Sequence, residues 1–304
     1  MRFSIPKPLY YYSGALSLVG GGYLLKDYIT GNVYNYNHEL ADKVIIVTGS
    51  NTGIGKEIVR SLAKHQAKVI MACRDMKKCE TTRRDIVIES RNKYVYCRKC
   101  DLASQTSIRE FVDHFKKEYD RLDILINNAG VMRCPKSHTE EGIEMHLGVN
   151  HMGHFLLTNL LLDVLKDSAP SRIVNLTSNA HKRGTIKLKD LNSDQNYDPG
   201  DAYAQSKLAN ILFTKELAKK LKGTGVTVNS VHPGLVRTEL MRHMGISQSV
   251  IGNFFINIST WIFAKTPIKG AQPVLFVAID PSLKDVTGGY FINNKKCNVS
   301  KEAK

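Results

Sequence analysis

The sequence predicts a doubly wound α/β fold, in which a seven-stranded parallel sheet carries helices on both faces. Short aliphatic or β-branched runs recur along the chain, and helical patterns separate them. The first run ends in a glycine-rich turn. This alternation is typical of parallel strands that are joined by covering helices. A chain of 304 residues with a hydrophobic fraction of 42% is long enough for one such domain with a full core.

The expected elements follow one another in regular order. The strands are predicted at 44–47, 68–72, 94–98, 124–126, 172–176, 227–231 and 289–292. The helices are predicted at 53–65, 77–90, 104–119, 139–166, 202–221 and 267–278. Ser104 illustrates the helical signals, because it is a suitable N-cap and precedes an apolar stripe at Ile108, Phe111 and Phe115. The domain is expected to span 42–294, with a basic tail at 295–304.

The segment 1–41 is expected to be an apolar anchor followed by a polar linker. Between Lys7 and Lys26 the chain carries no charge and is rich in tyrosine, leucine and glycine. A helix over 9–25 would span only about 25 Å, which is short of a hydrocarbon core of about 30 Å. We therefore predict a shallow contact with a membrane surface, and the alternative is an arm that packs on its own domain.

Charge and cysteines exclude several other classes of protein. The formal net charge is +15, but Lys and Arg are scattered in pairs among acids and do not form a stripe with aromatics, so nucleic acid is not an expected partner. Six cysteines include one CxxC, at Cys97 and Cys100, without the other ligands of a zinc site. We expect reduced, buried thiols and no metal.

The glycine turn after the first strand predicts a dinucleotide site and hence a Rossmann-type fold. Glycines allow a tight turn and close backbone approach to a pyrophosphate, and the N-terminus of the next helix offers N–H groups and partial positive charge. The residues expected to contact the cofactor here are Gly49, Ser50, Asn51, Thr52, Gly53, Ile54 and Gly55.

The end of the second predicted strand favours NADP(H) over NAD(H). An NAD site usually has an acid at this position, whereas here Arg74 stands first and can pair with a 2′-phosphate, with Lys77 or Lys78 nearby. Asp75, the next residue, is an acid that would favour NAD(H), unless it serves instead as the N-cap of the following helix. Asp101, after the third strand, is a candidate for the adenine amino group or for a local cap.

Tyr203 and Lys207 lie four residues apart on a predicted helix, so their side chains share one face. Lowering a phenol pKa from about 10 toward about 7 takes about 4 kcal/mol. An ammonium about 4 Å away supplies about the same at an effective dielectric of about 20. Tyr203 is therefore a candidate general acid/base, and the alternative is an amphipathic tyrosine in the core.

Ser178 and Asn150 are two further candidate catalytic residues. Ser178 ends the fifth predicted strand, where open α/β sheets bind ligands, and its hydroxyl can hold a substrate oxygen. Asn150 lies inside a predicted helix although it is a poor helix former, and it can hold a water that passes protons outward. Either residue alone is more often structural, so the prediction depends on their joint presence.

In these motifs the chain resembles the short-chain dehydrogenase/reductase family over roughly 42–292, and in Ala72-Cys-Arg-Asp-Met and the segment 149–158 it resembles the retinol dehydrogenase branch. The resemblance implies that Tyr203 exchanges the proton, Ser178 orients the substrate oxygen, Lys207 binds the nicotinamide ribose, and Asn150 holds the relay water. It adds a set of cofactor-binding residues, which are Leu102, Asn128, Ala129, Gly130, Pro233, Gly234, Val236 and Thr238.

The chain differs from the pattern of the wider family at two places. Thr177 stands where many relatives have a second serine, and the 25 residues from Ser178 to Tyr203 are more than in most of the wider family. The branch implies membrane attachment, at the mitochondrial inner membrane or the endoplasmic reticulum. Many relatives also form homodimers through the helix that carries the catalytic tyrosine.

The segment 240–266 is expected to be a substrate lid. It is rich in Met, Phe and Ile, including Phe254 and Phe255, and such an apolar, flexible lining suits a lipophilic substrate. Core packing of two short helices is the alternative. The leading prediction is an NADP(H)-dependent enzyme that interconverts retinol and retinal, mostly as a reductase. A broader lipid aldehyde or steroid carbonyl reductase and a non-catalytic NADP(H)-sensing scaffold remain as alternatives.

Overall fold

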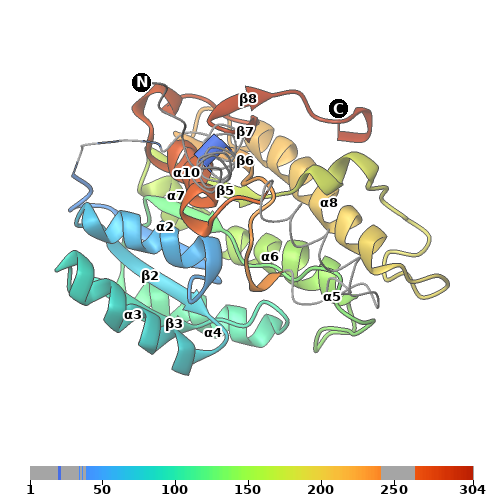
Figure 1. The fold of residues 1–304 in the computed structure, drawn as a ribbon, viewed down its shortest axis with the longest axis horizontal. Helices are drawn as coiled ribbons and strands as arrows, with labels where there is room; N and C mark the ends of the chain where they lie inside the picture. Colours follow the sequence, from blue (N-terminus) through green and yellow to red (C-terminus); the bar gives the residue numbers. More distant parts are fainter. Residues whose placement is uncertain (1–19, 22–33, 35, 37–38, 241–263, 304) are drawn as a thin grey trace, which may run out of the picture.

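The computed structural model describes residues 20–21, 34, 36, 39–240 and 264–303. Within these residues one sheet has the strand order β3-β2-β1-β4-β5-β6-β7-β8, and it is parallel except for the last pair (Figure 1). The strands are β1 (Val44–Thr48), β2 (Lys68–Cys73), β3 (Val95–Lys99), β4 (Ile124–Asn127), β5 (Ser171–Leu176), β6 (Val226–His232), β7 (Tyr290–Ile292) and β8 (Lys295–Cys297).

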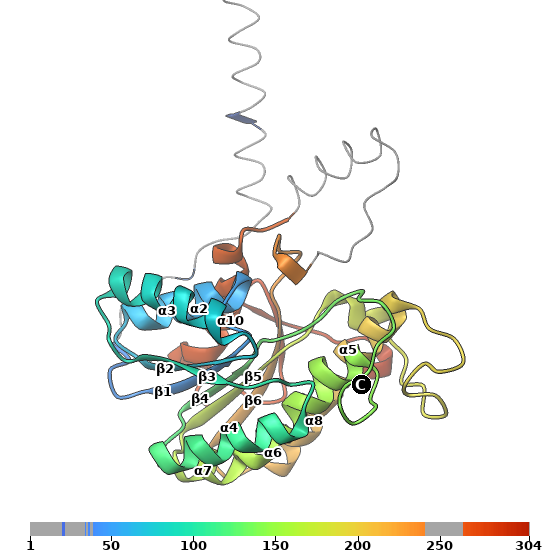
Figure 2. The same ribbon diagram turned by 90° about the horizontal axis from the view of Figure 1, so that it is seen from below.

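Helices cover both faces of the sheet, so the predicted doubly wound fold is confirmed (Figure 2). One face carries α2 (Gly53–Lys64), α3 (Met76–Ser90) and α10 (Pro267–Ile279). The other carries α4 (Gln105–Glu118), α6 (Gly153–Leu160), α7 (Leu162–Asp167) and α8 (Pro199–Lys220). Each face has its own apolar core, which explains why the central strands are almost continuously hydrophobic.

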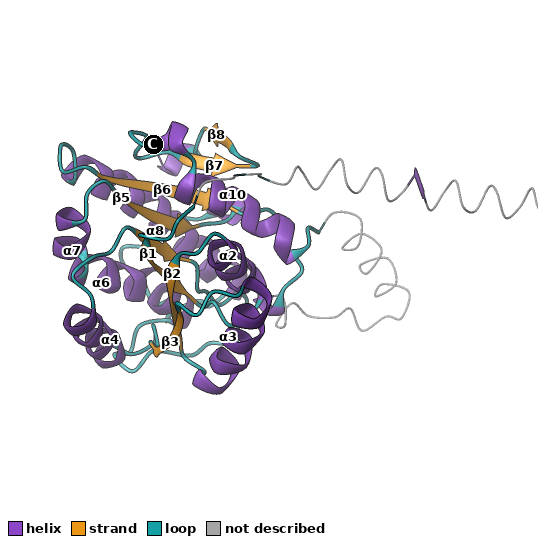
Figure 3. Cartoon of the chain, turned by 90° about the vertical axis from the view of Figure 1, so that its left-hand side faces the viewer, coloured by secondary structure: helices purple, strands orange, loops and turns teal. Residues whose placement is uncertain are grey.

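The strand order reverses next to β1, which pairs with β2 on one side and with β4 on the other. Such a switch point opens a crevice beyond the carboxyl ends of the strands, where α/β sheets bind ligands. Figure 3 shows the sheet with β3 at one edge and β7 and β8 at the other. The carboxyl ends of β1, β2, β4, β5 and β6 therefore all face one crevice.

The predicted continuous helix over 139–166 was wrong. The segment begins with a bridge between His138 and Glu144, and only then enters α5 (Met145–Leu147). A π-helical turn, η1 (Gly148–Met152), follows and leads into α6, and the helix ends again at Leu161 before α7. Asn150 lies in this π turn, and π turns in helices are frequent at functional sites.

Two cysteines differ from the expectation of reduced thiols. Cys79 of α3 and Cys97 of β3 form a disulfide, because strand pairing and helix packing bring their Cα atoms to 6.1 Å. The segment 295–303, expected to be a tail, contains β8 and the 3-10 turn η5 (Lys301–Ala303). Ala303 is buried, and its carbonyl accepts a hydrogen bond from Lys215 of α8.

Tyr34 and Tyr36 attach the described end of the linker to α2 and α10. The backbone N–H of Tyr34 donates to the Gln272 side chain, its ring packs on Phe276, and the Tyr36 hydroxyl bonds to Ser61. The apolar segment 7–26 lies almost wholly outside the described residues. Among the residues that are described, no helix combines the length and the apolar character that a membrane span requires.

Candidate active site

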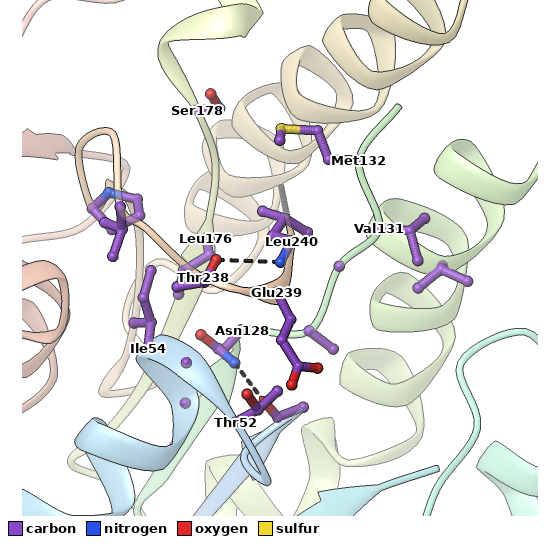
Figure 4. Close-up of a pocket in the computed structure, with 18 of the residues that line it drawn as sticks. Thr52, Ile54, Asn128, Val131, Met132, Leu176, Ser178, Thr238, Glu239 and Leu240 are labelled. Atoms are coloured by element: carbon purple, nitrogen blue, oxygen red, sulfur yellow. Dashed lines mark hydrogen bonds between the residues drawn. The ribbon is translucent and has the colours of Figure 1, made fainter. Parts of the chain in front are cut away.

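A cavity of about 580 Å³ fills the crevice beyond β1, β4 and β5 (Figure 4). Nearly all of the residues predicted to bind a cofactor line it. They are Gly49, Asn51, Thr52, Gly53, Ile54, Gly55, Arg74, Asp101, Leu102, Asn128, Ala129, Gly130, Tyr203, Lys207, Pro233, Gly234, Val236 and Thr238. Ser50 is an exception, because its buried hydroxyl donates to the carbonyl of Val47 and faces the core.

The glycine turn has a backbone that other residues would not tolerate. Gly49 has φ +61°, and a Cβ there would lie 2.8 Å from the Cα of Ala129. At Gly55 an added Cβ would lie only 2.5 Å from the carbonyl oxygen of Gly49. The predicted roles of these glycines, a tight turn and close packing of helix on strand, agree with this geometry.

The N-terminus of α2 is open toward the cavity. Thr52 is its N-cap residue, but the Thr52 side chain makes no capping hydrogen bond to the first turn. The first turn therefore has backbone N–H groups without a side-chain cap, beside glycines that allow close approach. This arrangement fits the pyrophosphate of a dinucleotide.

The end of β2 presents cations to the cavity, while the acid there is engaged in a helix cap. Arg74, Asp75 and Lys78 all line the cavity. The Asp75 carboxylate accepts a hydrogen bond from the backbone N–H of Lys78 at 3.0 Å and caps α3. Asp101 also lines the cavity, and its carboxylate accepts from the backbone N–H of Ala103, so both of its proposed roles remain compatible with the geometry.

The catalytic candidates meet at the ends of β5 and α8. Ser178 and Tyr203 both line the cavity, a side-chain interaction with Ser178 acts to lower the pKa of the Tyr203 phenol, and Lys207 lies with its Nζ 5.6 Å from the centre of the Tyr203 ring. The Lys207 ammonium donates to the carbonyl of Leu176 at 3.3 Å, and Thr177 donates to the carbonyl of Lys207. Thr177 thus has a structural partner in α8.

Burial dominates the ionisation of this pair. Burial of the phenol raises the pKa of Tyr203 to about 12, and the side-chain interaction with Ser178 acts in the opposite direction. Burial lowers the pKa of the Lys207 ammonium to about 8. The expectation that Lys207, together with the positive charge of an oxidised nicotinamide, brings the Tyr203 pKa toward neutrality stays a prediction, because burial is the largest cause of both shifts and no contribution of a cofactor enters them.

Asn150 joins three parts of the site through a fully buried side chain. Its Oδ1 accepts from the backbone N–H of Val131 at 2.8 Å, and its Nδ2 donates to the Val131 carbonyl and to Ser206 of α8. Its backbone carbonyl accepts from the Asn210 side chain at 3.0 Å. The Asn150 amide therefore holds the loop after β4 against α8. Its Oδ1 accepts one of the two hydrogen bonds that an amide oxygen can accept in these contacts, and the relay water at Asn150 stays a prediction.

Thr48 and His154 form a polar contact that the sequence analysis missed. The Thr48 hydroxyl accepts from the backbone N–H groups of Asn128 and Ala129, and it bonds to His154 Nε2 at 2.9 Å. His154 Nδ1 bonds to the carbonyl of Asn150. Burial lowers the pKa of His154 to about 3, so this imidazole is neutral. No local pattern marked these residues, because their contact joins strands and helices far apart in the sequence.

Several further lining residues were not predicted as site residues, and they include Met132, Leu235 and Glu239. Leu240, which also lines the cavity, is the first residue of the predicted lid. In Figure 4 Met132 lies near Ser178, and the Glu239 side chain reaches toward Thr52. The stretch beyond Leu240, including Phe254 and Phe255, lies outside the described residues. The apolar wall near Ser178 nevertheless suits a lipophilic substrate.

A family model of short chain dehydrogenases matches residues 43–248. This chain therefore belongs to the short-chain dehydrogenase family, and it is an oxidoreductase of that family.

Within that family the chain is similar to retinol dehydrogenase 13 from Homo sapiens, which is 51% identical over 94% of this chain and 87% of its own length. A solved structure of an uncharacterized protein from Mycobacterium paratuberculosis is 33% identical with a TM-score of 0.71, over 90% of this chain and 91% of that one. The RhlG/NADP active-site complex from Pseudomonas aeruginosa is 26% identical with a TM-score of 0.66, over 83% and 95%. The resemblance to the retinol dehydrogenase branch is thereby confirmed.

We expect Gly49→Ala to weaken both folding and cofactor binding more than Gly223→Ala does. Both glycines have positive φ, so both substitutions carry about 1–2 kcal/mol of left-handed strain. Only the added Cβ at Gly49 meets another residue, Ala129, whereas Gly223 faces open space. Urea unfolding and titration with NADPH measure the two effects. Equal losses in both variants would show that the approach of Gly49 to Ala129 is unimportant.

Proposed function

We propose that this protein is an NADP(H)-dependent enzyme that interconverts retinol and retinal, working mainly as a reductase of all-trans-retinal. The observation that carries the proposal is the convergence of Ser178, Tyr203 and Lys207 in a cavity that also contains Arg74 and the glycine turn. The name of the similar human protein, retinol dehydrogenase 13, supports the substrate class. The apolar wall with Met132 and Leu240 is consistent with a long hydrocarbon chain.

The cofactor preference rests on charge at the end of β2. Arg74 and Lys78 line the cavity, and the nearest acid, Asp75, already accepts a hydrogen bond in its helix cap. A planar guanidinium can pair with two oxygens of a 2′-phosphate, which NAD(H) lacks. The NADP complex of RhlG, a protein with the same fold, is compatible with this preference.

In the proposed reaction the glycine turn and Lys207 would hold a nicotinamide cofactor, which in its reduced form would provide the hydride for the carbonyl carbon of the substrate. Ser178 holds the carbonyl oxygen, and Tyr203 donates its phenolic proton to that oxygen as negative charge develops there. Its raised pKa keeps Tyr203 protonated and ready to donate throughout the physiological range. Lys207 binds the ribose and stabilises the phenolate that forms, and a water at Asn150 returns a proton to Tyr203.

Two further proposals concern the setting of the enzyme. The apolar segment 7–26 supports attachment to a membrane surface, at the mitochondrial inner membrane or the endoplasmic reticulum. A homodimer through α6 and α8 is supported by the partly exposed Met152 and Phe155, because Phe155 contacts Phe213 of α8 and extends the same apolar face.

The alternatives differ in substrate or in class. A broader reductase of lipid aldehydes or steroids would use the same Tyr203 and the same cofactor. A sensing scaffold would bind NADPH without turnover, and it would not need the side-chain interaction between Ser178 and Tyr203.

Replacement of the catalytic phenol tests the proposal as a whole. We expect Tyr203→Phe to reduce retinal turnover by about 10²- to 10⁴-fold, because the proton donor is lost, while NADPH still binds. NADPH consumption is measured with all-trans-retinal, medium-chain aldehydes and ketosteroids for both proteins. Binding of NADPH without turnover on any substrate of the panel would favour the scaffold, and Tyr203-dependent turnover of ketosteroids alone would favour the broader reductase.

Arg74→Ala tests the cofactor preference. Loss of a charge-assisted contact to the 2′-phosphate should weaken NADPH binding by about 10- to 100-fold and leave NADH binding unchanged. Lys77→Ala is the matched control, because this neighbouring cation does not line the cavity. Dissociation constants of both cofactors for the three proteins give the answer. A similar loss for NADH in Arg74→Ala would contradict recognition of the phosphate.

The buried ammonium predicts a pH limit on the reaction. The pKa of Lys207 is lowered to about 8, so the cation is present below that pH and lost above it. We therefore expect kcat/KM for NADPH, which reports the free enzyme, to fall as pH rises through about 8. Lys207→Arg keeps its charge and should lose this inflection, although its rate will be lower. Persistence of the same inflection in Lys207→Arg would assign it to another group.

A further inference from the structure

A buried cluster of polar side chains lies beside Tyr203 and takes no part in the chemistry described above. It contains Glu144 and His146 of the α5 region, Cys134 of the loop after β4, and Tyr197 just before α8. Glu144 and His146 are completely inaccessible to solvent. A buried carboxylate is costly unless it is paired and hydrogen-bonded, so this arrangement calls for a physical reason.

The Glu144 carboxylate is held by three donors. It accepts from His146 Nδ1 at 2.6 Å and from the backbone N–H groups of His146 and Leu147 at 2.9 Å each. Burial acts to raise the pKa of Glu144, but these hydrogen bonds outweigh it and the pKa is lowered. The backbone N–H of Glu144 itself donates to the Asn192 side chain. The carboxylate is therefore ionised and fixed in place.

The fixed carboxylate in turn sets the orientation of the His146 ring. With Nδ1 donating to Glu144, the plane of the imidazole is determined by the position of the carboxylate. The His146 ring meets the Tyr203 ring at a centroid distance of 6.2 Å and an angle of 71°, which is an edge-to-face contact. Among the described contacts, His146 thus joins the carboxylate directly to the catalytic phenol.

Activation of the neighbouring Cys134 thiol does not explain why Glu144 and His146 are paired. Cys134 Sγ lies 3.6 Å from Nε2 and 3.9 Å from Nδ1 of His146. A sulfur at nearly equal distances from both ring nitrogens is not in line with either, so the pair does not activate Cys134 as a nucleophile. The Cys134 side chain packs on the imidazole instead.

Tyr203 requires a partner that restricts its ring. The helix fixes its backbone, and Ser206 donates to its carbonyl. A change of the χ1 rotamer or a tilt of the ring would still move the phenol oxygen, whereas rotation about χ2 leaves that oxygen on its axis. Lys207 lies on one side of the ring, and His146 contacts it from α5. A donor oxygen that is misplaced by about 1 Å can cost about 10²-fold in rate.

We propose that His146, oriented by Glu144, is a positioning residue that holds the Tyr203 phenol in line with the substrate oxygen. This inference rests on the proposed function, because it assigns meaning to the orientation of Tyr203 only if that phenol transfers the proton. It also explains why the carboxylate of Glu144 is kept ionised in a dry site, since an ionised acceptor binds His146 more strongly than a neutral one does.

The test compares His146→Gln and His146→Ala with the control Tyr197→Phe. Tyr197 belongs to the same cluster, donates to the Cys134 carbonyl and has its hydroxyl 3.5 Å from His146 Nδ1, but it makes no ring contact with Tyr203 among the described residues. Tyr197→Phe therefore measures the effect of disturbing the cluster while the His146 ring is kept. We expect kcat for retinal reduction to fall by about 10- to 100-fold in His146→Ala, with the dissociation constant of NADPH unchanged within about twofold. His146→Gln should retain more activity, because its amide can still donate to Glu144.

Thermal unfolding of the same variants separates positioning from stability. If His146→Ala does not fold, the comparison of His146→Gln with Tyr197→Phe still decides the question. A kcat that is unchanged in folded His146 variants, or lowered no more than in Tyr197→Phe, overturns the proposal. Since Glu144 acts through His146, the losses in Glu144→Gln and His146→Gln should not add in the double variant, and additive losses would contradict the coupling.

Tyr203→Phe keeps the two proposals apart. If Tyr203→Phe retains full turnover, the proposed function itself fails. If it abolishes turnover while the His146 variants behave like the unmodified protein, only the positioning role of His146 is wrong.

Discussion

The contact on which both halves of the site depend is the hydroxyl of Thr48. It lies at the end of β1, where the strand order reverses, and it accepts hydrogen bonds from the first two backbone N–H groups after β4. Through His154 it is also connected to the carbonyl of Asn150. One neutral hydroxyl therefore ties the glycine turn to the loop under the nicotinamide site and to the π turn that leads to α8. Because Thr48 carries no charge and burial lowers the pKa of His154 to about 3, the charge of these contacts does not change near neutral pH.

The pKa values of Tyr203 and Lys207 are set mainly by burial of the two side chains and less by the distance between them. Coulomb attraction between a phenolate and an ammonium can lower a phenol pKa, but Tyr203 and Lys207 are both buried, and burial disfavours the charged form of each group. A high phenol pKa suits proton donation, and an easily deprotonated lysine makes the site sensitive to alkali.

The sequence was sufficient for most of the fold because parallel strands buried on both faces leave unambiguous aliphatic runs. The glycine turn, Ser178, Tyr203 and Lys207 line one cavity, as expected from their positions at strand ends and on one helix face, while their catalytic roles stay predictions. Asn150 was placed in a continuous helix because its π turn depends on contacts with Val131 and Ser206, which are distant in sequence.

Three other features were beyond the reach of local patterns. Ser50 was expected to contact the cofactor, but the turn directs its hydroxyl to the core. The roles of Glu144 and His146 depend on the approach of α5 to α8, which no sequence period encodes. The pairing of Cys79 with Cys97 required knowledge of how α3 packs on β3.

Because of the Cys79–Cys97 disulfide, the folding stability of a sample depends on whether this bond is oxidised or reduced. The bond links residues that are 18 apart, and closing a loop of this size removes enough disorder from the unfolded chain to favour folding by about 3 kcal/mol. Protein prepared with and without a thiol reductant would therefore be two species of the same sequence with different unfolding equilibria. The oxidised and reduced proteins differ by two electrons. Variants of this protein should therefore be compared in the same redox state, just as they are compared at the same pH and salt concentration.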